Sequence, residues 1–446
     1  MSSLKHIVAA TCTALACTSV YAQTEIQFWH SMTGALGERV TGLADGFNQS
    51  QKAYKVVPVY KGGYADSMAA AIAATRAGNA PHIVQIFEVG TATMMAAAAD
   101  ETAKRKKGVV KPVYQVMAEG GVKFDPKVYV PAVRDYYTDK TGRMLSLPFN
   151  SSTTVFYYNV DAFKKAGLDP NAPPKTWPDV QAAAQKIRDT NATACGYTSG
   201  WQSWVHMENL HAWHNEPYAT LQNGFGGLHT ELQINSKLAI RHVALLSAWV
   251  KGGLFSYGGR ANEAEAKFYG GECAMLTSSS AAYANIKKNA KFEFAVSQLP
   301  YYDDYPGAPQ NTIIGGASLW VMAGKKPADY KGVAQFFNYL SKPELQAEWH
   351  QATGYLPITK AAYDITKKQG FYEKNPGTDV SVRQMTGKAP TANSKGVRLG
   401  YLPQIRTAID EELEAVWAGK KAPKEALDEA VKRGNELLRK FEQANK

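Results

Sequence analysis

Two runs of hydroxyl side chains are the first residues in this sequence that could bind a ligand. Residues 151–154 separate two apolar stretches, and residues 278–280 stand between an apolar stretch and a helix expected at 281–288. Hydroxyls both donate and accept hydrogen bonds, so they suit phosphate or sugar oxygens. The N-terminus of a helix also favours an anion. The simpler alternatives are a turn that satisfies its own backbone and the capping of a helix by one serine.

Gly315 and Gly316 form a second candidate, ahead of an apolar stretch that ends at Met322. Two adjacent glycines let a ligand approach the backbone closely, because no Cβ is in the way. Exposed N–H groups in such a turn can hold an anion. The pair predicts a loop that crosses between two lobes, where ligands often bind. The alternative is a glycine-rich turn before a core strand.

Arg406 is a third candidate, because it lies where a helix disfavours a cation. Residues 403–406 (PQIR) open an amphipathic helix. The positive end of the helix dipole opposes a cation in the first turn, which suggests a nearby anion that offsets it. A guanidinium offers paired donors that match a phosphate group. The alternative is a solvated surface arginine.

The elements that must position these residues predict an α/β fold. Strands are expected at 25–29, 54–60 and 81–87, with helices at 40–47 and 64–77 between them. This alternation predicts a parallel sheet with right-handed crossovers. Ligands of such sheets lie at the carboxyl ends of strands, where Tyr64 and Glu88 fall. Each also has a simpler role, as an aromatic packed on the sheet and as a solvated loop acid.

Caps mark several helices in the second half of the chain. Asp161 is the expected N-cap of a helix that Gly167 ends, and Thr176 with Asp179 forms a capping box. Ser236 is the expected cap of a further helix.

Aromatic and imidazole side chains gather in the same half. Trp177, Trp201 and Trp204 could each line a ligand pocket, although core packing is the simpler role for any one of them. The histidines at 206, 211 and 214 match no metal-binding pattern, so we expect no metal site.

Length and composition limit the possible classes of protein. The chain has 446 residues, 45% hydrophobic and 20% charged, which predicts a globular protein of two domains. Its 50 basic against 39 acidic residues give a net charge of +11. The charges are interspersed except at 104–107, so the bias suits an anionic small ligand or a generally basic surface. No nucleic-acid-binding motif is present, and we expect no nucleic-acid partner.

Residues 1–22 are typical of a secretory signal, with Lys5 before a short apolar region and a small residue at the cleavage position. A lipoprotein signal that ends at Cys17 is the weaker alternative. The mature chain would keep Cys195 and Cys273. In an oxidising compartment these two could form a disulfide, or they could be buried free thiols.

Catalytic patterns are absent from the sequence. It contains no Gly-x-Ser-x-Gly elbow, no His-Glu-x-x-His, no Walker loop and no Cys-x-x-Cys. We therefore expect no enzymatic activity, no catalytic residue and no cofactor.

Taken together, these residues resemble the periplasmic sn-glycerol-3-phosphate-binding proteins of ABC importers, over essentially the whole mature chain. Residues 161–177 are shared more widely with maltose-type binding proteins. The charged stretch at 98–110 is longer than expected for the family. The resemblance is carried by residues 28–32 (FWHSM), 60–64 (YKGGY), 87–95 (FEVGTATMM), 148–153 (PFNSST), 157–170 (YYNVDAFKKAGLDP), 314–322 (IGGASLWVM), 349–359 (WHQATGYLPIT) and 402–406 (LPQIR).

The resemblance implies a two-lobe periplasmic binding protein of type II, with a mixed sheet flanked by helices in each lobe and a hinge of several crossings. The implied N-terminal lobe is 23–147 with 312–354, and the C-terminal lobe is 148–311 with 355–446. The implied ligand-binding residues, matched position by position to the family's motifs, are Tyr64, Glu88, Ser152, Ser279, Gly316, Tyr355 and Arg406.

The implied partners are glycerol-3-phosphate or a glycerophosphodiester and the membrane subunits of an ABC permease, with the binding protein a periplasmic monomer. Two alternatives stay open. A neutral-sugar binder of the same fold should lack Arg406 and be richer in aromatics and carboxylates. A secreted phosphodiesterase or glycosidase needs a metal cluster or paired carboxylates.

Overall fold

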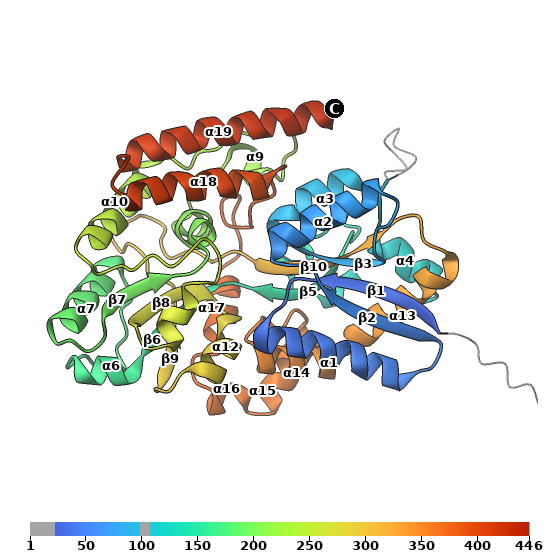
Figure 1. The fold of residues 1–446 in the computed structure, drawn as a ribbon, viewed down its shortest axis with the longest axis horizontal. Helices are drawn as coiled ribbons and strands as arrows, with labels where there is room; N and C mark the ends of the chain where they lie inside the picture. The colour runs from blue at the N-terminus through green and yellow to red at the C-terminus, as the bar shows by residue number, and fades with distance from the viewer. Residues whose placement is uncertain (1–22, 99–107, 446) are drawn as a thin grey trace, which may run out of the picture.

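The computed structural model describes residues 23–98 and 108–445, and it contains two β-sheets, each flanked by helices (Figure 1). The expected signal segment 1–22 and the basic run 104–107 lie outside the described residues. No helix within 23–98 or 108–445 has the length and hydrophobicity needed to cross a bilayer.

The first sheet is built mainly from the N-terminal part of the chain. β1 pairs in parallel with β2 and β3, as the alternation of strands and helices predicts. β10 returns from far along the chain and runs antiparallel to β3, β4 and β5, which makes the sheet mixed. Its strands are β1 (Thr24–His30), β2 (Tyr54–Tyr60), β3 (Ile83–Phe87), β4 (Val110–Lys111), β5 (Leu147–Ser152) and β10 (Gly315–Met322).

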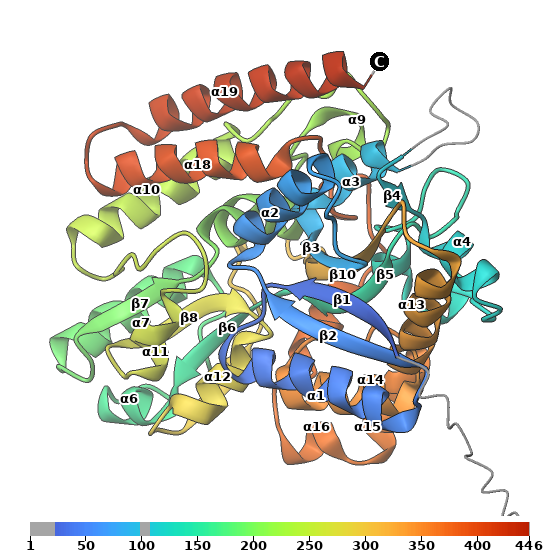
Figure 2. The same ribbon diagram turned by 45° about the vertical axis from the view of Figure 1, so that its right-hand side comes forward.

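The helices of this half include the two expected between its first strands and three that follow β10. Figures 1 and 2 both place α2 and α3 over one face of the sheet, and α1 and α14 over the other. The helices are α1 (Gly34–Ser50), α2 (Tyr64–Arg76), α3 (Thr91–Ala97), α4 (Val113–Glu119), α5 (Pro131–Arg134), α13 (Pro327–Leu340), α14 (Pro343–Thr353) and α15 (Lys360–Lys368), with 3-10 turns η1 (Glu88–Gly90) and η2 (Pro126–Val128).

The second sheet has the order β7-β8-β6-β9. Cys195 and Cys273 face each other in the β7–β8 register and form a disulfide, so the free-thiol alternative is wrong. The strands are β6 (Thr154–Asn159), β7 (Cys195–Ser199), β8 (Cys273–Ser279) and β9 (Phe294–Ser297).

The helices of this half include a C-terminal pair, α18 and α19, which packs with α10 (Figure 2). The helices are α6 (Val160–Lys165), α7 (Trp177–Asp189), the π-helix η3 (Trp204–Asn209), α8 (Leu210–Trp213), α9 (Thr220–Asn223), α10 (Lys237–Lys251), α11 (Glu265–Tyr269), α12 (Ala282–Asn289), α16 (Phe371–Lys374), α17 (Val380–Thr386), α18 (Leu402–Trp417) and α19 (Pro423–Ala444).

Local capping explains where the helices of this half begin. Thr176 and Asp179 form the predicted capping box, and Ser236 caps α10. The prediction of Asp161 as an N-cap is wrong. Asn159 accepts the N–H of Ala162 at 2.9 Å and starts the helix two residues earlier. Asp161 lies in the first turn instead, where the helix dipole favours an acid.

Three segments connect the two halves and are hydrogen-bonded to one another. The hydroxyl of Thr153 donates to the carbonyl of Ile313 at 2.7 Å, and Leu356 N–H donates to the carbonyl of Ser151 at 2.7 Å. The lobe boundaries expected from the sequence stay a prediction with two adjustments. Lys360–Lys368, expected in the C-terminal lobe, form α15, which packs against α14 of the first half. Pro148 to Ser152 belong to β5, so the chain leaves the first sheet after Ser152.

Candidate functional site

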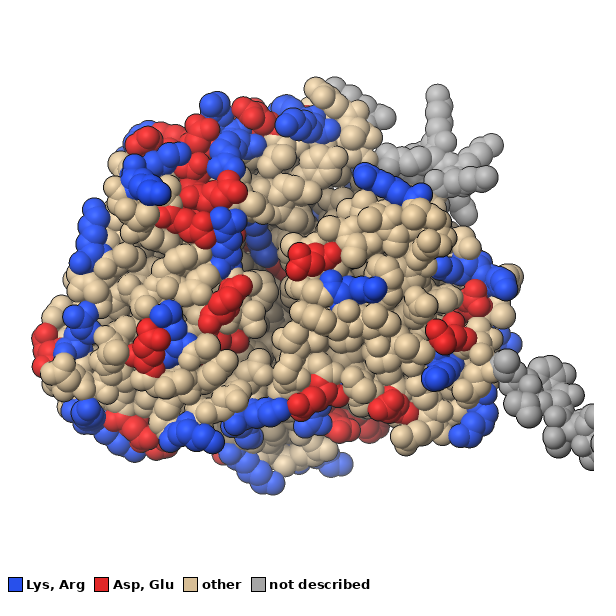
Figure 3. Space-filling view, in the orientation of Figure 1, with Lys and Arg blue, Asp and Glu red and all other residues tan. Residues whose placement is uncertain are grey.

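An inner cavity of about 80 Å³ lies between the two halves, and an outer cleft of about 510 Å³ continues it. Figure 3 shows a groove between the halves of the molecule, bordered by acidic and basic side chains. Side chains such as Tyr64, Trp204 and Arg406 line both spaces. The inner cavity brings together all seven residues expected from the sequence: Tyr64, Glu88, Ser152, Ser279, Gly316, Tyr355 and Arg406.

The glycine pair forms the start of β10, where it pairs with β5. The expected loop ahead of the strand is therefore wrong for these two residues. Gly316 has φ +86°, and a Cβ there would lie 1.8 Å from the carbonyl oxygen of Asn150. At Gly315 a Cβ would lie 2.3 Å from the indole of Trp204. The space that the missing Cβ atoms leave is thus filled in part by Asn150 and Trp204 and not by a ligand alone.

The two hydroxyl runs each deliver one serine to the cavity, at the end of a strand. Ser152 ends β5, and its buried hydroxyl makes no hydrogen bond to any described residue. Ser279 ends β8, and its hydroxyl accepts the N–H of Ala281 at 3.2 Å. Ser278 lies inside β8, and its hydroxyl donates to Glu265 at 2.8 Å. α12 begins only at Ala282, so the serines are not at its first turn.

Two tyrosines reach the cavity from different elements. The ring of Tyr64, at the start of α2, stacks on Phe87 with centroids 5.3 Å apart, and its hydroxyl accepts from the Asn150 amide at 3.0 Å. Tyr355 follows α14, and its ring is buried. Burial raises the pKa of Tyr64 well above its ordinary value and that of Tyr355 to about 12. Both hydroxyls are therefore neutral and can donate to a ligand.

Arg406 is held between two buried carboxylates. Its Nε and Nη2 donate to the two oxygens of Glu208 at 2.6 and 2.9 Å, and Nη2 also donates to Glu88 at 2.6 Å. These anions explain how a cation is tolerated in the first turn of α18, where only 8% of its surface is exposed. Nη1 has no partner among the described residues, so its two N–H groups are free for a ligand.

Electrostatics at this cluster follow from burial and pairing. Burial raises the pKa of Glu88, and the facing guanidinium of Arg406 lowers it, with a net rise. Burial lowers the pKa of Arg406, and the two carboxylates raise it by more. Arg406 therefore stays charged at any pH at which the protein is folded.

Sequence reasoning did not select Glu208 or Glu265, which both lie at this site. Glu208 is the only charged residue in the run 204–214 and is 2% exposed. A single acid in such an apolar and aromatic run is a usable sign of a buried, paired carboxylate. Glu265 lines the inner cavity from the start of α11.

The aromatic candidates divide into two groups. Trp201 and Trp204 line the cavity and the cleft, whereas Trp177 is buried in the core against His242, with ring centroids 4.6 Å apart. His206 hydrogen-bonds His242 at 3.0 Å. Within the described part of the chain, no three His, Cys, Asp or Glu side chains are grouped so as to hold a metal ion.

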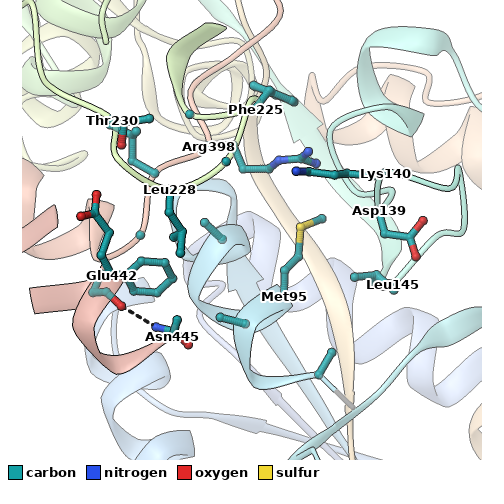
Figure 4. Close-up of a pocket in the computed structure, with 18 of the residues that line it drawn as sticks. Met95, Asp139, Lys140, Leu145, Phe225, Leu228, Thr230, Arg398, Glu442 and Asn445 are labelled. Atoms are coloured by element: carbon teal, nitrogen blue, oxygen red, sulfur yellow. Dashed lines mark hydrogen bonds between the residues drawn. The ribbon is translucent and has the colours of Figure 1, made fainter. Parts of the chain in front are cut away.

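A second cavity, of about 460 Å³, lies elsewhere between the halves (Figure 4). Its wall is largely apolar, with Met95 and Leu228 among its residues, and it contains none of the seven expected residues. Lys140 and Arg398 are two basic residues labelled in Figure 4 that line it. We regard it as the main competing location for an anion.

A family model for bacterial extracellular solute-binding proteins matches residues 42–378. The chain belongs to this family. Its curated relatives include the sn-glycerol-3-phosphate-binding periplasmic protein UgpB of Yersinia pseudotuberculosis, 58% identical over 439 residues and 98% of each chain. UgpB of Pectobacterium atrosepticum is 57% identical over 98% of this chain and 97% of that protein, and UgpB of Salmonella typhimurium is 54% identical over the full length of both.

Solved structures of solute-binding proteins have the same fold. UgpB from Mycobacterium tuberculosis in complex with glycerophosphocholine superposes with a TM-score of 0.77 at 21% identity, over 94% of this chain and 99% of that one. The maltose-bound MalE3 of T. maritima gives a TM-score of 0.72 at 16% identity, over 93% and 100%. The predicted two-lobe α/β binding-protein fold is therefore confirmed.

Proposed function

We propose that this chain is the periplasmic solute-binding component of an ABC importer, and that it binds sn-glycerol-3-phosphate and glycerophosphodiesters and delivers them to the membrane permease. The observation that carries the proposal is the convergence of donors for an oxyanion on one small cavity. Arg406, whose Nη1 has no partner among the described residues, lines it together with Ser152 and Gly316. Relatives that are 54–58% identical over the whole chain are named for sn-glycerol-3-phosphate.

In this proposal the phosphate lies in the inner cavity. Charge-assisted hydrogen bonds from Arg406 and neutral donors from Ser152, Ser279 and the two tyrosines hold its oxygens. Because Arg406 already faces two carboxylates, it adds little net positive charge. Affinity for the phosphate therefore depends on the geometry of the N–H and O–H donors more than on long-range electrostatic attraction. A glycerol hydroxyl would donate to the remaining oxygen of Glu88.

The outer cleft is suited to the head group of a diester. Its acids Asp66, Glu263 and Asp410 outnumber its cations Arg260 and Arg406, and the aromatic residues Tyr60 and Trp201 line it as well. Acids and aromatic faces both attract an organic cation such as an ammonium group. We infer that a zwitterionic diester such as glycerophosphocholine fits both spaces, with its phosphate inside and its cation outside.

Calorimetric titration of the mature protein tests the proposal. The ligands are glycerol-3-phosphate, glycerophosphocholine and maltose, and the variants are Ser152→Ala and Arg406→Lys. Loss of a hydrogen bond to a charged group costs about 1.5–3 kcal/mol, so Ser152→Ala should weaken glycerophosphate binding by about 10- to 150-fold. Arg406→Lys should also weaken it by more than about tenfold, because an ammonium cannot reproduce the guanidinium's paired donors.

The substitution at Arg406 is to lysine because alanine would leave two buried carboxylates without a cation, which destabilises the fold by about 3–5 kcal/mol. Ser341→Ala is the matched control, since the hydroxyl of Ser341 bonds within its own helix end to the carbonyl of Phe337. Binding of maltose without any glycerophosphate would contradict the proposal and favour a neutral-sugar binder.

A further inference from the structure

Glu265 is a second carboxyl group in the inner cavity, and it has no cation partner. It begins α11, is 4% exposed, and accepts one hydrogen bond, from the hydroxyl of Ser278 at 2.8 Å. None of the ion pairs among the described residues includes it. Glu88, in the same cavity, differs in that Arg406 neutralises it.

The groups around Glu265 do not compensate a negative charge. The neighbouring acid Glu263 raises its pKa further, and the nearby side chains of Tyr157 on β6 and Tyr355 across the cavity are neutral phenols. The lysines of α11 and α12 are engaged elsewhere: Lys267 pairs with Glu272, Lys288 pairs with Glu38, and Lys287 lies over the ring of Tyr283.

Burial without a cation disfavours the ionised form of a carboxyl group. Burial raises the pKa of Glu265 to about 7, with the hydrogen bond from Ser278 opposing the rise. The side chain therefore exchanges a proton with solvent near neutral pH. As a neutral acid it gains an O–H donor, which an ionised carboxylate lacks.

Glu265 lies in the cavity proposed for the ligand, so its protonation state can affect ligand binding. Ser278, its hydrogen-bond partner, is adjacent to Ser279 at the end of β8, and both Ser279 and Glu265 line the same cavity of about 80 Å³. An anion in so small a space lies next to the carboxyl group. A phosphate oxygen would repel the ionised form and would accept a hydrogen bond from the neutral form.

This inference rests on the proposed function. We propose that Glu265 binds the ligand phosphate as a neutral acid, donating its proton to a phosphate oxygen, so that ligand binding takes up one proton from solvent. At pH values where free Glu265 is ionised, affinity then falls as pH rises, by up to about tenfold for each pH unit. At pH values where it is already protonated, affinity does not depend on this group.

Glycerophosphocholine is the probe that isolates the protein's proton. A phosphomonoester titrates near pH 6 and would add its own pH dependence, whereas a diester has no second ionisation. Calorimetric titrations at pH 6, 7, 8 and 9, in buffers of different ionisation enthalpy, give both the affinity and the number of protons taken up. For the wild-type protein we expect uptake close to one proton at pH 8 or above, and an affinity that falls with pH in that range.

Glu265→Gln supplies an uncharged side chain that keeps donors at the same place. We expect it to bind within a few-fold of wild type at pH 6, with no proton uptake and an affinity that is flat up to pH 9. Two other acids serve as matched controls. Glu272→Gln and Glu293→Gln, at acids that pair with Lys267 and Lys164 and line neither the cavity nor the cleft, should both keep the uptake.

Binding by the wild-type protein with no proton uptake would overturn the role of Glu265 and leave the proposed function in place. The same conclusion follows if Glu265→Gln takes up the proton as wild type does. If no glycerophosphate ligand binds the wild-type protein at any pH, both the role of Glu265 and the proposed function fail. Uptake in the wild-type protein is assigned to Glu265 only by its loss in the variant, because the pKa values of Glu88 and Asp410 are also raised. Glu265→Ala is a second variant that lacks the proton, and absence of wild-type uptake needs no variant.

Discussion

Arg406 shows at the scale of single residues how the chain prepares a cation for a ligand. Two donors face Glu208 in a paired geometry and one faces Glu88, which fixes the guanidinium plane before any ligand arrives. The remaining nitrogen is free. Such fixed donors need little reorganisation on binding, which preserves affinity. The same pairing makes the arginine a structural group, so its removal tests stability as well as binding.

Gly316 makes a sharper prediction at this scale. Gly316→Ala should destabilise the protein by several kcal/mol and abolish ligand binding. An added Cβ would lie 1.8 Å from the carbonyl oxygen of Asn150, and the φ of +86° is itself unfavourable for alanine. Denaturant unfolding measures the loss. Gly324→Ala is the control, with φ +78° and no atom of residues 23–98 or 108–445 within 4 Å of an added Cβ, and should cost only about 1 kcal/mol. Equal losses in the two variants would contradict the steric argument.

Tyr64, Glu88, Gly316 and Arg406 were accessible from residue type and from their expected places near the ends of strands or helices. The two hydroxyl runs were accessible in the same way, whereas Ser152, Ser279 and Tyr355 were singled out only by the family resemblance. The presence of Glu208 and Glu265 at the same site could not be predicted from the sequence. Glu208 is 198 positions from Arg406, and no periodicity in one sequence specifies such a pairing. Only the folded chain brings Glu88 and Glu208 onto one guanidinium.

At the scale of elements, local patterns predicted well where one short-range rule decides the structure. The alternation at 54–60 gives β2 with the expected bounds, and Thr176 with Asp179 starts α7. Local patterns failed where the conformational preference of a residue competes with strand pairing. The glycine pair was expected in a loop because adjacent glycines let a ligand approach the backbone, yet pairing with β5 carries both residues into β10.

The disulfide between β7 and β8 gives a prediction for these elements. It closes a segment 78 residues long, so its loss should lower stability by about 2–5 kcal/mol. Unfolding of a Cys195→Ala, Cys273→Ala double variant measures this loss against wild type. The oxidised mature protein should also show no reactive thiol under denaturing conditions. Two titratable thiols would contradict the bond.

The buried histidines of η3 and α10 predict an acid-sensitive core. Burial lowers the pKa of His206 to about 3, while an unfolded histidine has a pKa near 6.5. Below about pH 6.5 the unfolded chain binds a proton that the folded chain excludes, so stability falls as pH drops toward 3, by up to about 1.4 kcal/mol per pH unit.

Comparison with His206→Gln isolates this effect from that of buried acids such as Glu265, whose raised pKa acts in the opposite direction. The unfolding free energy of wild type minus that of the variant should be constant above pH 7 and should decrease between pH 6.5 and 4. A difference that does not change with pH would remove His206 as the cause.

At the scale of the whole molecule, two sheets are joined by three segments that bond to one another, with the cavity beside them. The Glu88–Arg406 pair connects an element that follows the first sheet to a C-terminal helix across the cavity. Opening of the cleft must break this pair, and a ligand that restores its hydrogen bonds would favour closure. This coupling depends on contacts between distant segments, which is why the sequence predicted the two lobes better than their boundaries.

The most direct test is a crystal structure of the mature protein with glycerol-3-phosphate. The phosphate oxygens should lie within about 3.2 Å of Arg406 Nη1, the Ser152 hydroxyl and the backbone N–H of Gly316. A phosphate bound instead between Lys140 and Arg398, in the second cavity of Figure 4, would contradict the assignment of the site.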